Sequence, residues 1–267
     1  MSIAAVSFFK AEWHYLREWL HYHRLIGIDK FYLTCNDQDA DRAYEILEPY
    51  IEAGWVAFEH DPSTPGFYRQ TEAFNRRHRE VTQKWTAFID LDEFIVVEGD
   101  NLPNLLRRYD DECGLVVEWY NFGTSFRKTA PTLQTRDLIW RASNNFHRNQ
   151  LYKTIAKTNC IERMTNPHGG LYKGNRLPVD EHKSPVSDQY INTSRTCMRK
   201  EHIWLNHYRI RSQADWQDKK IRWEGGGHPF LSSNPEHYFN LFDRNEIQDM
   251  TIHRLVPSLI SSLASPL

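Results

Sequence analysis

Three carboxylates, Asp90, Asp92 and Glu93, interrupt an apolar part of the chain. The run 85–89 before them is apolar on both faces, which is typical of a buried central strand, and residues 94–97 are apolar again. Because strand side chains alternate, we expect Asp90 and Asp92 to point to the same side. Two oxygen ligands at the carboxyl end of a strand suit Mg²⁺ or Mn²⁺, which share their remaining positions with substrate phosphates. The alternative is a surface turn with solvated acids.

Length and charge narrow the class of protein. The 267 residues are enough for one large α/β domain or two small ones. Thirty-three basic and 35 acidic residues give a net charge of −2, which offers no electrostatic reason to expect a nucleic-acid partner. Aromatic residues make up 13 %, with nine Trp, and exposed aromatic faces can hold sugars, although most will lie in the core.

The cysteines and the lengths of the apolar runs indicate in which cellular compartment the protein is expected. The four cysteines are widely spaced, so the sequence predicts neither a zinc site nor a disulfide framework. The N-terminus has no basic, apolar leader pattern, and no apolar run approaches the ~20 residues that span a bilayer. The sequon Asn192-Thr-Ser194 is discounted for want of a secretory signal. We therefore expect a cytoplasmic protein, with peripheral membrane contact left open.

Strands and helices alternate over the first part of the chain. We expect strands at 3–9, 30–35, 55–59 and 85–89, separated by helices at about 16–25, 39–51 and 70–81. This alternation predicts a parallel sheet with right-handed crossovers, an architecture typical of nucleotide-binding proteins. No Gly-x-Gly-x-x-Gly follows the first strand, which argues against a dinucleotide fold of the dehydrogenase kind.

The pattern is weaker after residue 97. We expect a helix at 102–109, a strand at 114–120, a strand at 203–208 and a helix from a cap at Ser212 to about residue 221. Gly225-Gly-Gly227 is a candidate hinge or lid, and a plain surface loop is the alternative. The sequence contains no internal repeat.

Several spaced motifs together resemble one enzyme group. They are Lys10-x-Glu12-x-x-Tyr15, Glu18-Trp19-x-x-Tyr22-His23, Asn36-Asp37, Gln70, Phe88-Ile-Asp-x-Asp-Glu-Phe94, Trp119-x-x-Phe-Gly123 and Asn206-His-Tyr-x-x-Arg-Ser212. In this order they resemble the glycosyltransferases of family 92 and of the family 2-like group, over residues 3–225. The resemblance implies a GT-A-like α/β fold with a mostly parallel central sheet flanked by helices.

The chain departs from the family pattern at three places. Lys-Asn-Glu is usual after the first strand, and here Ala11 stands in the middle. A Lys is usual before Ser212, and here it is Arg211, which keeps the charge needed for phosphate binding. An Arg-Gly pair commonly follows the last helix, and here Glu224-Gly225 replaces it.

The resemblance implies transfer of a sugar, with inversion, from a nucleotide diphosphate, with UDP the expected nucleotide. The expected donor-binding residues are Lys10, Glu12, Asn36, Asp37, Gln70, Asp90, Lys153 and Arg211. The expected acceptor is a glycan or a lipid-linked glycan, as in polysaccharide biosynthesis. As domains we expect a single unit over 1–267, with a nucleotide-sugar half (1–98), an acceptor-side half (99–230) and a C-terminal extension (231–267).

A divalent ion, Mn²⁺ or Mg²⁺, would stabilise the diphosphate leaving group. The expected ligands are Asp92 directly, Asp90 directly or through water, and His207, with His168 as the alternative histidine. The competing interpretation of His207 is a core histidine bonded to the backbone. Arg211 would add charge near the diphosphate, at the N-terminus of a helix.

Two questions stay open from the sequence. The general base is not assigned, and the candidates are Glu118, Asp137, Asp180 and Glu181. Two other functions compete with the transferase. One is a HAD-like metal-dependent phosphohydrolase, in which Asp-x-Asp usually follows the first strand. The other is a catalytically inactive glycan-binding module, which would have no need to keep both Asp90 and Asp92.

Overall fold

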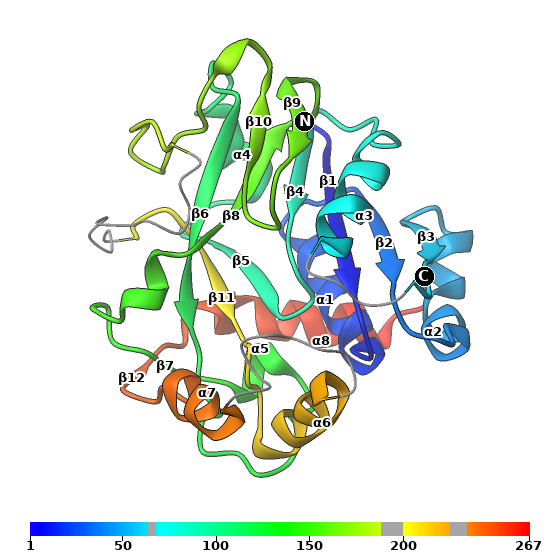
Figure 1. The fold of residues 1–267 in the computed structure, drawn as a ribbon, viewed down its shortest axis with the longest axis vertical. Helices are drawn as coiled ribbons and strands as arrows, with labels where there is room; N and C mark the ends of the chain where they lie inside the picture. The colour runs from blue at the N-terminus through cyan, green and yellow to red at the C-terminus, as the bar shows by residue number, and fades with distance from the viewer. Residues whose placement is uncertain (64–67, 188–199, 225–233) are drawn as a thin grey trace.

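The computed structural model describes residues 1–63, 68–187, 200–224 and 234–267, without the side chains of 222–224 (Figure 1). The sequon at Asn192, Cys197, the side chain of Glu224 and the glycines 225–227 lie outside this description. In the part of the chain that is described, no helix is both long and apolar enough to cross a membrane.

One sheet of eight strands forms the centre of the molecule (Figure 1). Its spatial order is β3-β2-β1-β4-β8-β6-β11-β5. The strands are β1 (Ile3–Phe9), β2 (Lys30–Cys35), β3 (Val56–His60), β4 (Trp85–Phe88), β5 (Glu93–Val97), β6 (Gly114–Asn121), β8 (Tyr152–Lys157) and β11 (Ile203–His207). The predicted α/β class is therefore confirmed.

The half built from β1 to β4 is parallel, as the alternation of strands and helices predicts. Its connections contain α1 (Leu16–Leu25), α2 (Asp41–Glu52) and α3 (Arg69–His78). The helix expected at about 16–25 buries one face, since Leu16, Trp19, Leu20 and His23 are all fully covered. Gly27 ends this connection with φ +108°, and a Cβ there would meet the ring of Pro103.

The other half of the sheet is mixed, and this was not predicted. Strand β8 runs antiparallel to β4 and β6, while β11 runs parallel to β6 and antiparallel to β5. The chain therefore leaves β4, turns through Asp90–Asp92, and continues as β5 at the far edge of the sheet. The register of β5 and β11 pairs Glu93 with His207, so the carboxylate turn lies beside the end of β11.

The remaining elements surround this sheet. They are α4 (Leu102–Arg107), α5 (Gln134–Asp137), α6 (Gln213–Glu224), α7 (Pro235–Phe242), α8 (Val256–Ala264), and the short strand pairs β7 (Trp140–Arg141) with β12 (Ile247–Gln248) and β9 (Ile161–Met164) with β10 (Gly170–Tyr172). In Figure 1, α5, α6 and α7 lie toward the end of the molecule to which β1 and β2 point. This is the edge where the carboxyl ends of the parallel strands meet.

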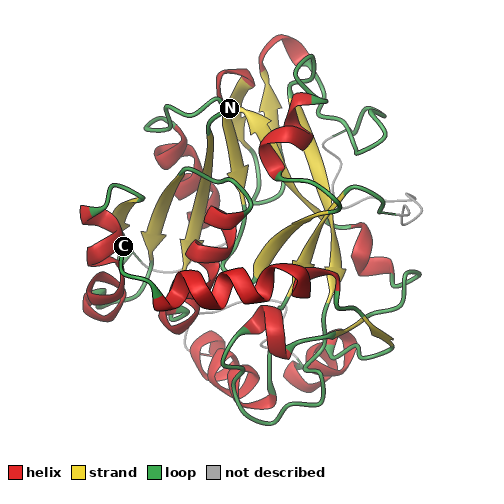
Figure 2. Cartoon of the chain, turned by 180° about the vertical axis from the view of Figure 1, so that it is seen from behind, coloured by secondary structure: helices red, strands yellow, loops and turns green. Residues whose placement is uncertain are grey.

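The segment 231–267, expected as an extension, contributes a helix that packs on α1. The Arg17 guanidinium donates to the carbonyl of Leu263 at 3.1 Å, and His21 Nδ1 lies 2.7 Å from the Ser262 hydroxyl. Figure 2 shows this helix in front of the sheet, leading to the C-terminus. Helix α8 therefore covers the back of α1 and holds it against the sheet.

Candidate functional site

The turn between β4 and β5 is held by hydrogen bonds to its main chain. The indole N–H of Trp19 donates to the carbonyls of Asp90 (3.1 Å) and Glu93 (3.0 Å). The Asp90 N–H donates to a Glu93 carboxylate oxygen at 2.8 Å, and the Tyr208 N–H donates to the Asp92 carbonyl at 2.7 Å. Helix α1 and strand β11 thus fix the turn from two sides.

The same helix holds the strand that follows the turn. The Tyr22 hydroxyl donates to the Ile95 carbonyl at 2.8 Å, and the Ile95 N–H donates to His23 Nε2 at 3.3 Å. His23 Nδ1 lies 2.9 Å from the Trp19 carbonyl, one helical turn earlier. The Trp19-x-x-Tyr22-His23 motif therefore acts by positioning the carboxylate turn and β5.

Asp90 is paired with a buried lysine and an amide. Lys153 Nζ lies 2.7 Å from Asp90 Oδ2, and the Gln70 side-chain amide donates to Asp90 Oδ1 at 2.5 Å. Lys153 is fully buried and also lies 3.8 Å from a Glu93 oxygen. Burial alone would lower the pKa of Lys153, but the negative charges of Asp90 and Glu93 raise it. The sequence-predicted residues Gln70, Asp90 and Lys153 are thus brought together.

Glu93 is buried beneath this pair. Burial raises the pKa of Glu93 well above its usual range; the Lys153 ammonium opposes that shift and the charges of Asp90 and Asp92 add to it. Its Oε1 has no hydrogen-bond partner among the described residues. Lys153 therefore lies between two carboxyl groups, with its closer contact to Asp90 at 2.7 Å.

Asp92 faces a histidine and a second lysine. Its Oδ1 lies 3.5 Å from His207 Nε2, and its Oδ2 lies 3.4 Å from Lys219 Nζ. Burial alone would raise the pKa of Asp92, but His207, Lys219 and Arg211 hold it well below its usual range. Burial lowers the pKa of His207 to about 3, so this ring is neutral near pH 7. The cations that keep Asp92 ionised are therefore Lys219 and Arg211.

The two candidate histidines lie against Trp119. Its ring centroid is 4.2 Å from that of His207 and 5.5 Å from that of His168. His168 Nδ1 is engaged with the Tyr152 carbonyl at 2.9 Å, whereas His207 Nδ1 has no hydrogen-bond partner in the described part of the chain. Since His207 Nε2 is the nitrogen that faces Asp92, the geometry favours His207 over His168 as a ligand.

Arg211 is buried in a cluster next to the carboxylate turn. Its Nη1 lies 2.7 Å from a Glu12 oxygen, its Nε donates to the Gln134 side chain at 2.6 Å, and its guanidinium covers the Tyr15 ring at 4.3 Å. Gln134 belongs to α5, whose first N–H groups are accepted by the buried carboxylate of Glu18. Arg211 thus links α5, the end of β1 and the start of α6.

The first N–H groups of α6 are already used within the protein. Those of residues 213 and 214 donate to the carbonyls of Arg127 and Lys128, and that of Asp215 donates to the Ser212 hydroxyl. The predicted cap at Ser212 is confirmed, and the Ser212 hydroxyl in turn donates to Asp215 at 2.5 Å. An anion at this helix end would therefore meet the Arg211 charge and the helix dipole, but few available N–H groups.

The predicted base and ribose contacts lie at the end of β2. The Asn36 side-chain amide donates to the carbonyls of Asp61 (2.7 Å) and Ser63 (3.0 Å), so its donors hold a loop. Asp37 Oδ2 accepts the Ala11 N–H at 2.9 Å, which joins the ends of β1 and β2. Lys10 is half-buried beside this junction. These residues share the strand-end edge with Asp90, and their donor contacts stay predictions.

The four candidate bases are not brought to the Asp92 side chain. Asp137, Asp180 and Glu181 accept backbone N–H groups of nearby turns or of the start of β11. Glu118 lies 3.2 Å from Lys200, and it alternates with Trp119 along β6, which puts it on the other face of the sheet from His207. The general base therefore remains unassigned.

The donor set at Asp92 fits a divalent ion held by two protein ligands. No cluster of three His, Cys, Asp or Glu side chains able to hold a metal occurs among the described residues. Asp92 and His207 nevertheless face each other at 3.5 Å, and two ligand atoms at about 2.1 Å from an octahedral ion lie about 3 Å apart. Mg²⁺ and Mn²⁺ commonly take few protein ligands and complete their shell with water and phosphate. Asp90, whose oxygens are engaged by Gln70 and Lys153, would contact the ion through a water molecule.

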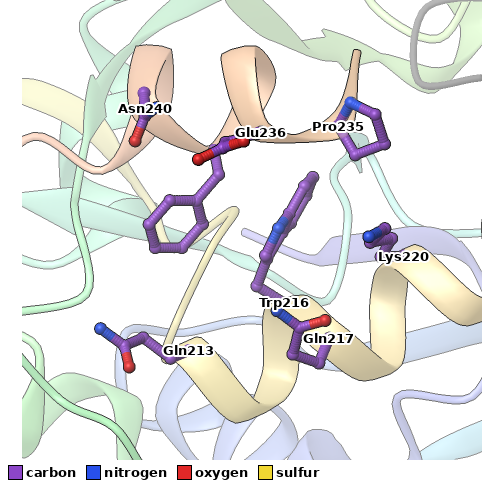
Figure 3. A pocket seen from close by; sticks show the side chains of 8 residues that line it. Gln213, Trp216, Gln217, Lys220, Pro235, Glu236 and Asn240 are labelled. Atoms are coloured by element: carbon purple, nitrogen blue, oxygen red, sulfur yellow. The ribbon is translucent and has the colours of Figure 1, made fainter. Parts of the chain in front are cut away.

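A surface cleft lies on the other side of α6, between it and α7. It has a volume of about 350 Å³ and is lined by Gln213, Trp216, Gln217, Lys220, Pro235, Glu236, Phe239 and Asn240. Figure 3 shows these side chains meeting between the two helices. Residues 213, 216, 217 and 220 form one face of α6, which leaves Lys219 on the neighbouring face, toward Asp92. The cleft is thus separate from the carboxylate turn.

Sequence reasoning missed two parts of this site. Lys219 carries no motif of its own, and only its place two turns after the Ser212 cap could have drawn attention to it. Trp19 belongs to one of the spaced motifs and to an expected helix, and neither pattern indicates that its N–H donates to the turn. Both residues occupy ordinary helical positions, and the sequence around them does not indicate the polar contacts that they make.

Solved structures give distant likenesses. The crystal structure of TarS from S. aureus, residues 1–349, is 11 % identical, with 91 % of this chain and 70 % of that chain covered and a TM-score of 0.41. The crystal structure of HddC from Yersinia pseudotuberculosis is 9 % identical, with 80 % and 96 % covered and a TM-score of 0.41.

Sequence comparison gives a firmer assignment. A rice protein (Oryza sativa subsp. japonica) described as a glycosyltransferase family 92 protein is 28 % identical over 137 residues, or 49 % of this chain. The match spans 23 % of that relative's length, so the chain corresponds to less than a quarter of it. The model of glycosyltransferase family 92 matches residues 1–247, the region that contains β1 to β11, the carboxylate turn and α6. The chain belongs to glycosyltransferase family 92.

Proposed function

We propose that this chain transfers a sugar from a nucleotide diphosphate donor, with UDP as the nucleotide, to a hydroxyl group of a glycan or lipid-linked glycan. The observation that carries the proposal is the pair Asp92 and His207, which face each other at 3.5 Å beside the carboxyl end of β4. Membership of glycosyltransferase family 92 supports the reaction class. A cytoplasmic location and peripheral membrane contact remain part of the proposal.

In this proposal Asp92 and His207 hold Mn²⁺ or Mg²⁺. The ion, when bound, would neutralise the charge that collects on the diphosphate as the glycosidic bond breaks. His207 suits this role because burial keeps its imidazole neutral, with a pKa of about 3, so one of its two ring nitrogens keeps a lone pair for the ion. A nitrogen ligand favours Mn²⁺ over Mg²⁺.

The other residues position the donor and the turn. Lys153 and Gln70 fix the Asp90 side chain, of which 28 % is exposed, so one edge of that carboxylate stays open toward a ribose or a metal-bound water. Glu12 is held by Arg211 at the end of β1, where it can accept hydrogen bonds from donor hydroxyls. These contacts orient a donor across the ends of β1 and β4 and leave proton removal from the acceptor to a group not yet identified.

The position of the Asp-x-Asp motif in the chain distinguishes the proposed transferase from a HAD-like phosphohydrolase. In HAD-type phosphatases Asp-x-Asp usually follows the first strand, whereas here it follows β4 and leads directly into β5. The glycan-binding alternative would make no use of Asp90 and Asp92, yet here each has its own buried or half-buried cationic partner. Both features favour a transferase.

The test is binding and turnover with defined nucleotides. Calorimetry with UDP, GDP, CMP and dTDP, each with and without Mn²⁺, should show Mn²⁺-dependent binding of UDP. Release of UDP from a panel of UDP-sugars should stop with EDTA and with Asp92→Asn. Asp110→Asn is the matched control, because Asp110 is exposed and pairs with Lys84 at the surface. Undiminished turnover by Asp92→Asn in EDTA, or tight GDP binding without UDP binding, would overturn the proposal.

A further inference from the structure

Helix α6 presents an ammonium group to the proposed metal ligand. Lys219 Nζ lies 3.4 Å from Asp92 Oδ2 and donates to the Arg209 carbonyl at 3.0 Å. Only 13 % of the Lys219 side chain and 9 % of the Asp92 side chain are exposed, so water screens this pair weakly. Among the described residues, Lys219 is therefore the ammonium group in contact with the Asp92 carboxylate.

The charges around Asp92 disfavour the presence of both the Lys219 ammonium and a divalent ion next to this carboxylate. Asp90 is neutralised by Lys153, Glu12 by Arg211, and Asp92 by Lys219. A divalent ion at Asp92 would add two positive charges beside carboxylates that already have cationic partners, and close to the Lys219 ammonium. Binding of the ion is therefore unfavourable unless Lys219 moves or new negative charge enters.

We propose that Lys219 is an exchangeable counter-cation. In the resting protein its ammonium forms an ion pair with the Asp92 carboxylate. When the divalent ion binds Asp92, the ammonium leaves this carboxylate and pairs with the diphosphate that enters with the ion. This inference rests on the proposed function, since it takes Asp92 as a metal ligand and a nucleoside diphosphate as the incoming anion. Lysine suits this task because its ammonium is a compact charge on a flexible stem of four carbons, so it can change partners without a change in the backbone.

The adjacent residue provides a matched control. Lys220 is also on α6, but it faces the cleft toward α7, as Figure 3 shows. Lys219→Met and Lys220→Met remove the same charge from the same helix and keep an aliphatic stem. Lys219→Arg keeps the charge. Thermal unfolding of each variant checks that the fold is retained.

The experiment measures binding, without turnover. Mn²⁺ affinity is determined by electron paramagnetic resonance on the protein without nucleotide, and UDP affinity by calorimetry at saturating Mn²⁺. For Lys219→Met we expect Mn²⁺ affinity to rise about tenfold, because a competing positive charge is lost, and UDP affinity to fall about tenfold, because a phosphate partner is lost. Lys220→Met should change both less than twofold, and Lys219→Arg should stay nearer the parent protein than Lys219→Met does.

Failure of this inference is distinguishable from failure of the proposed function. If the parent binds Mn²⁺ and Lys219→Met binds it equally or more weakly, the exchange is wrong while the metal site stands. Unchanged UDP affinity in Lys219→Met also overturns the exchange. If Lys219→Met binds Mn²⁺ and the parent does not, competition by Lys219 is supported. If neither protein binds Mn²⁺, with or without UDP, both proposals fail.

Discussion

The indole N–H of Trp19 lies 3.1 Å from the main-chain carbonyl oxygen of Asp90, and it is shared with the carbonyl of Glu93 at 3.0 Å. A side chain in the first helix thereby closes the turn that carries the carboxylates. The indole is fully buried, so no water can replace this donor if it is removed. The shape of the candidate site thus depends on a residue that has no contact with a ligand in the proposed mechanism.

Trp19→Phe should destabilise the protein and weaken nucleotide binding together. The substitution removes the indole donor from the buried Glu93 carbonyl and leaves the Asp90 carbonyl with the Glu93 N–H alone, which costs about 1–3 kcal/mol beyond the loss of ring volume. Trp85→Phe is the control, because Trp85 is equally buried and its indole nitrogen has no hydrogen-bond partner in the described structure. Urea unfolding and UDP–Mn²⁺ calorimetry measure the two effects. Equal losses of stability and of UDP affinity in both variants would show that the hydrogen bonds from Trp19 to the turn contribute to neither property.

Lys153 and Asp90 should behave as a coupled pair. Lys153→Met leaves Asp90 without its cation, and we expect a loss of about 2 kcal/mol, less than for a fully buried pair because Asp90 is partly exposed. Asp90→Asn should cost less on its own, since Lys153 still lies 3.8 Å from the Glu93 carboxyl group.

The double variant measures the coupling. Lys153→Met combined with Asp90→Asn should be more stable than the sum of the two single losses predicts, because no isolated charge remains. Urea unfolding of the four proteins at pH 7 gives the coupling free energy. Strict additivity would mean that the 2.7 Å contact does not contribute to stability.

The first half of the fold was predictable because its signals are local. Each strand from β1 to β3 is followed by an amphipathic helix. The consecutive strands β1 and β2, and β2 and β3, are parallel neighbours in the sheet. The carboxylate turn was also predictable, since Asp90 and Asp92 break an apolar run that resumes at once. Local periodicity and one interruption were enough for these features.

The second half depends on contacts between distant residues. Strand β5 pairs with β11, about 110 positions later, and no pattern in either strand specifies the partner. Strand β8 was missed because its second residue, Lys153, is a charged side chain in a fully buried place, which breaks the expected alternation. The pairing of Lys219 with Asp92 was also missed, because a lysine on a helix is usually exposed to solvent.

His23 should make the protein less stable as the pH falls. Burial lowers the pKa of its imidazole to about 3, below the 6.5 of an exposed histidine. Between pH 6.5 and 3 the unfolded chain therefore binds a proton that the folded chain refuses, so stability is complete above 6.5 and is lost as the pH decreases toward 3. The slope from this group approaches about 1.4 kcal/mol per pH unit.

The measurement is urea unfolding of the parent and of His23→Gln at several pH values from 7 to 4.5. The variant loses the bond from Ile95 and is less stable at pH 7, but its stability should fall less steeply with acid. The difference between the two curves isolates His23 from other buried histidines. Parallel curves would contradict a neutral, buried His23.

Substitution of Ala11 should be able to stabilise the protein, because the backbone of this residue is strained. It has φ +52°, the left-handed region that costs a residue with a Cβ roughly 1 kcal/mol relative to glycine. Its N–H is fixed by Asp37 at 2.9 Å, which holds this conformation at the end of β1. The Asn that is usual here in the family pattern tolerates such a φ, which gives a physical reason for that preference.

Ala11→Gly should therefore raise the free energy of unfolding by about 0.5–1 kcal/mol, after allowance for the greater freedom of glycine in the unfolded chain. Ala53→Gly is the matched control, because Ala53 is exposed and ends α2 with φ −69°, so the same substitution should lower stability by a similar amount. Urea unfolding at pH 7 compares the two with the parent. Ala11→Asn should lie between Ala11→Gly and the parent, since Asn reaches this φ at a smaller cost than Ala does. A loss of stability in Ala11→Gly equal to that in Ala53→Gly would show that the backbone at residue 11 is not strained.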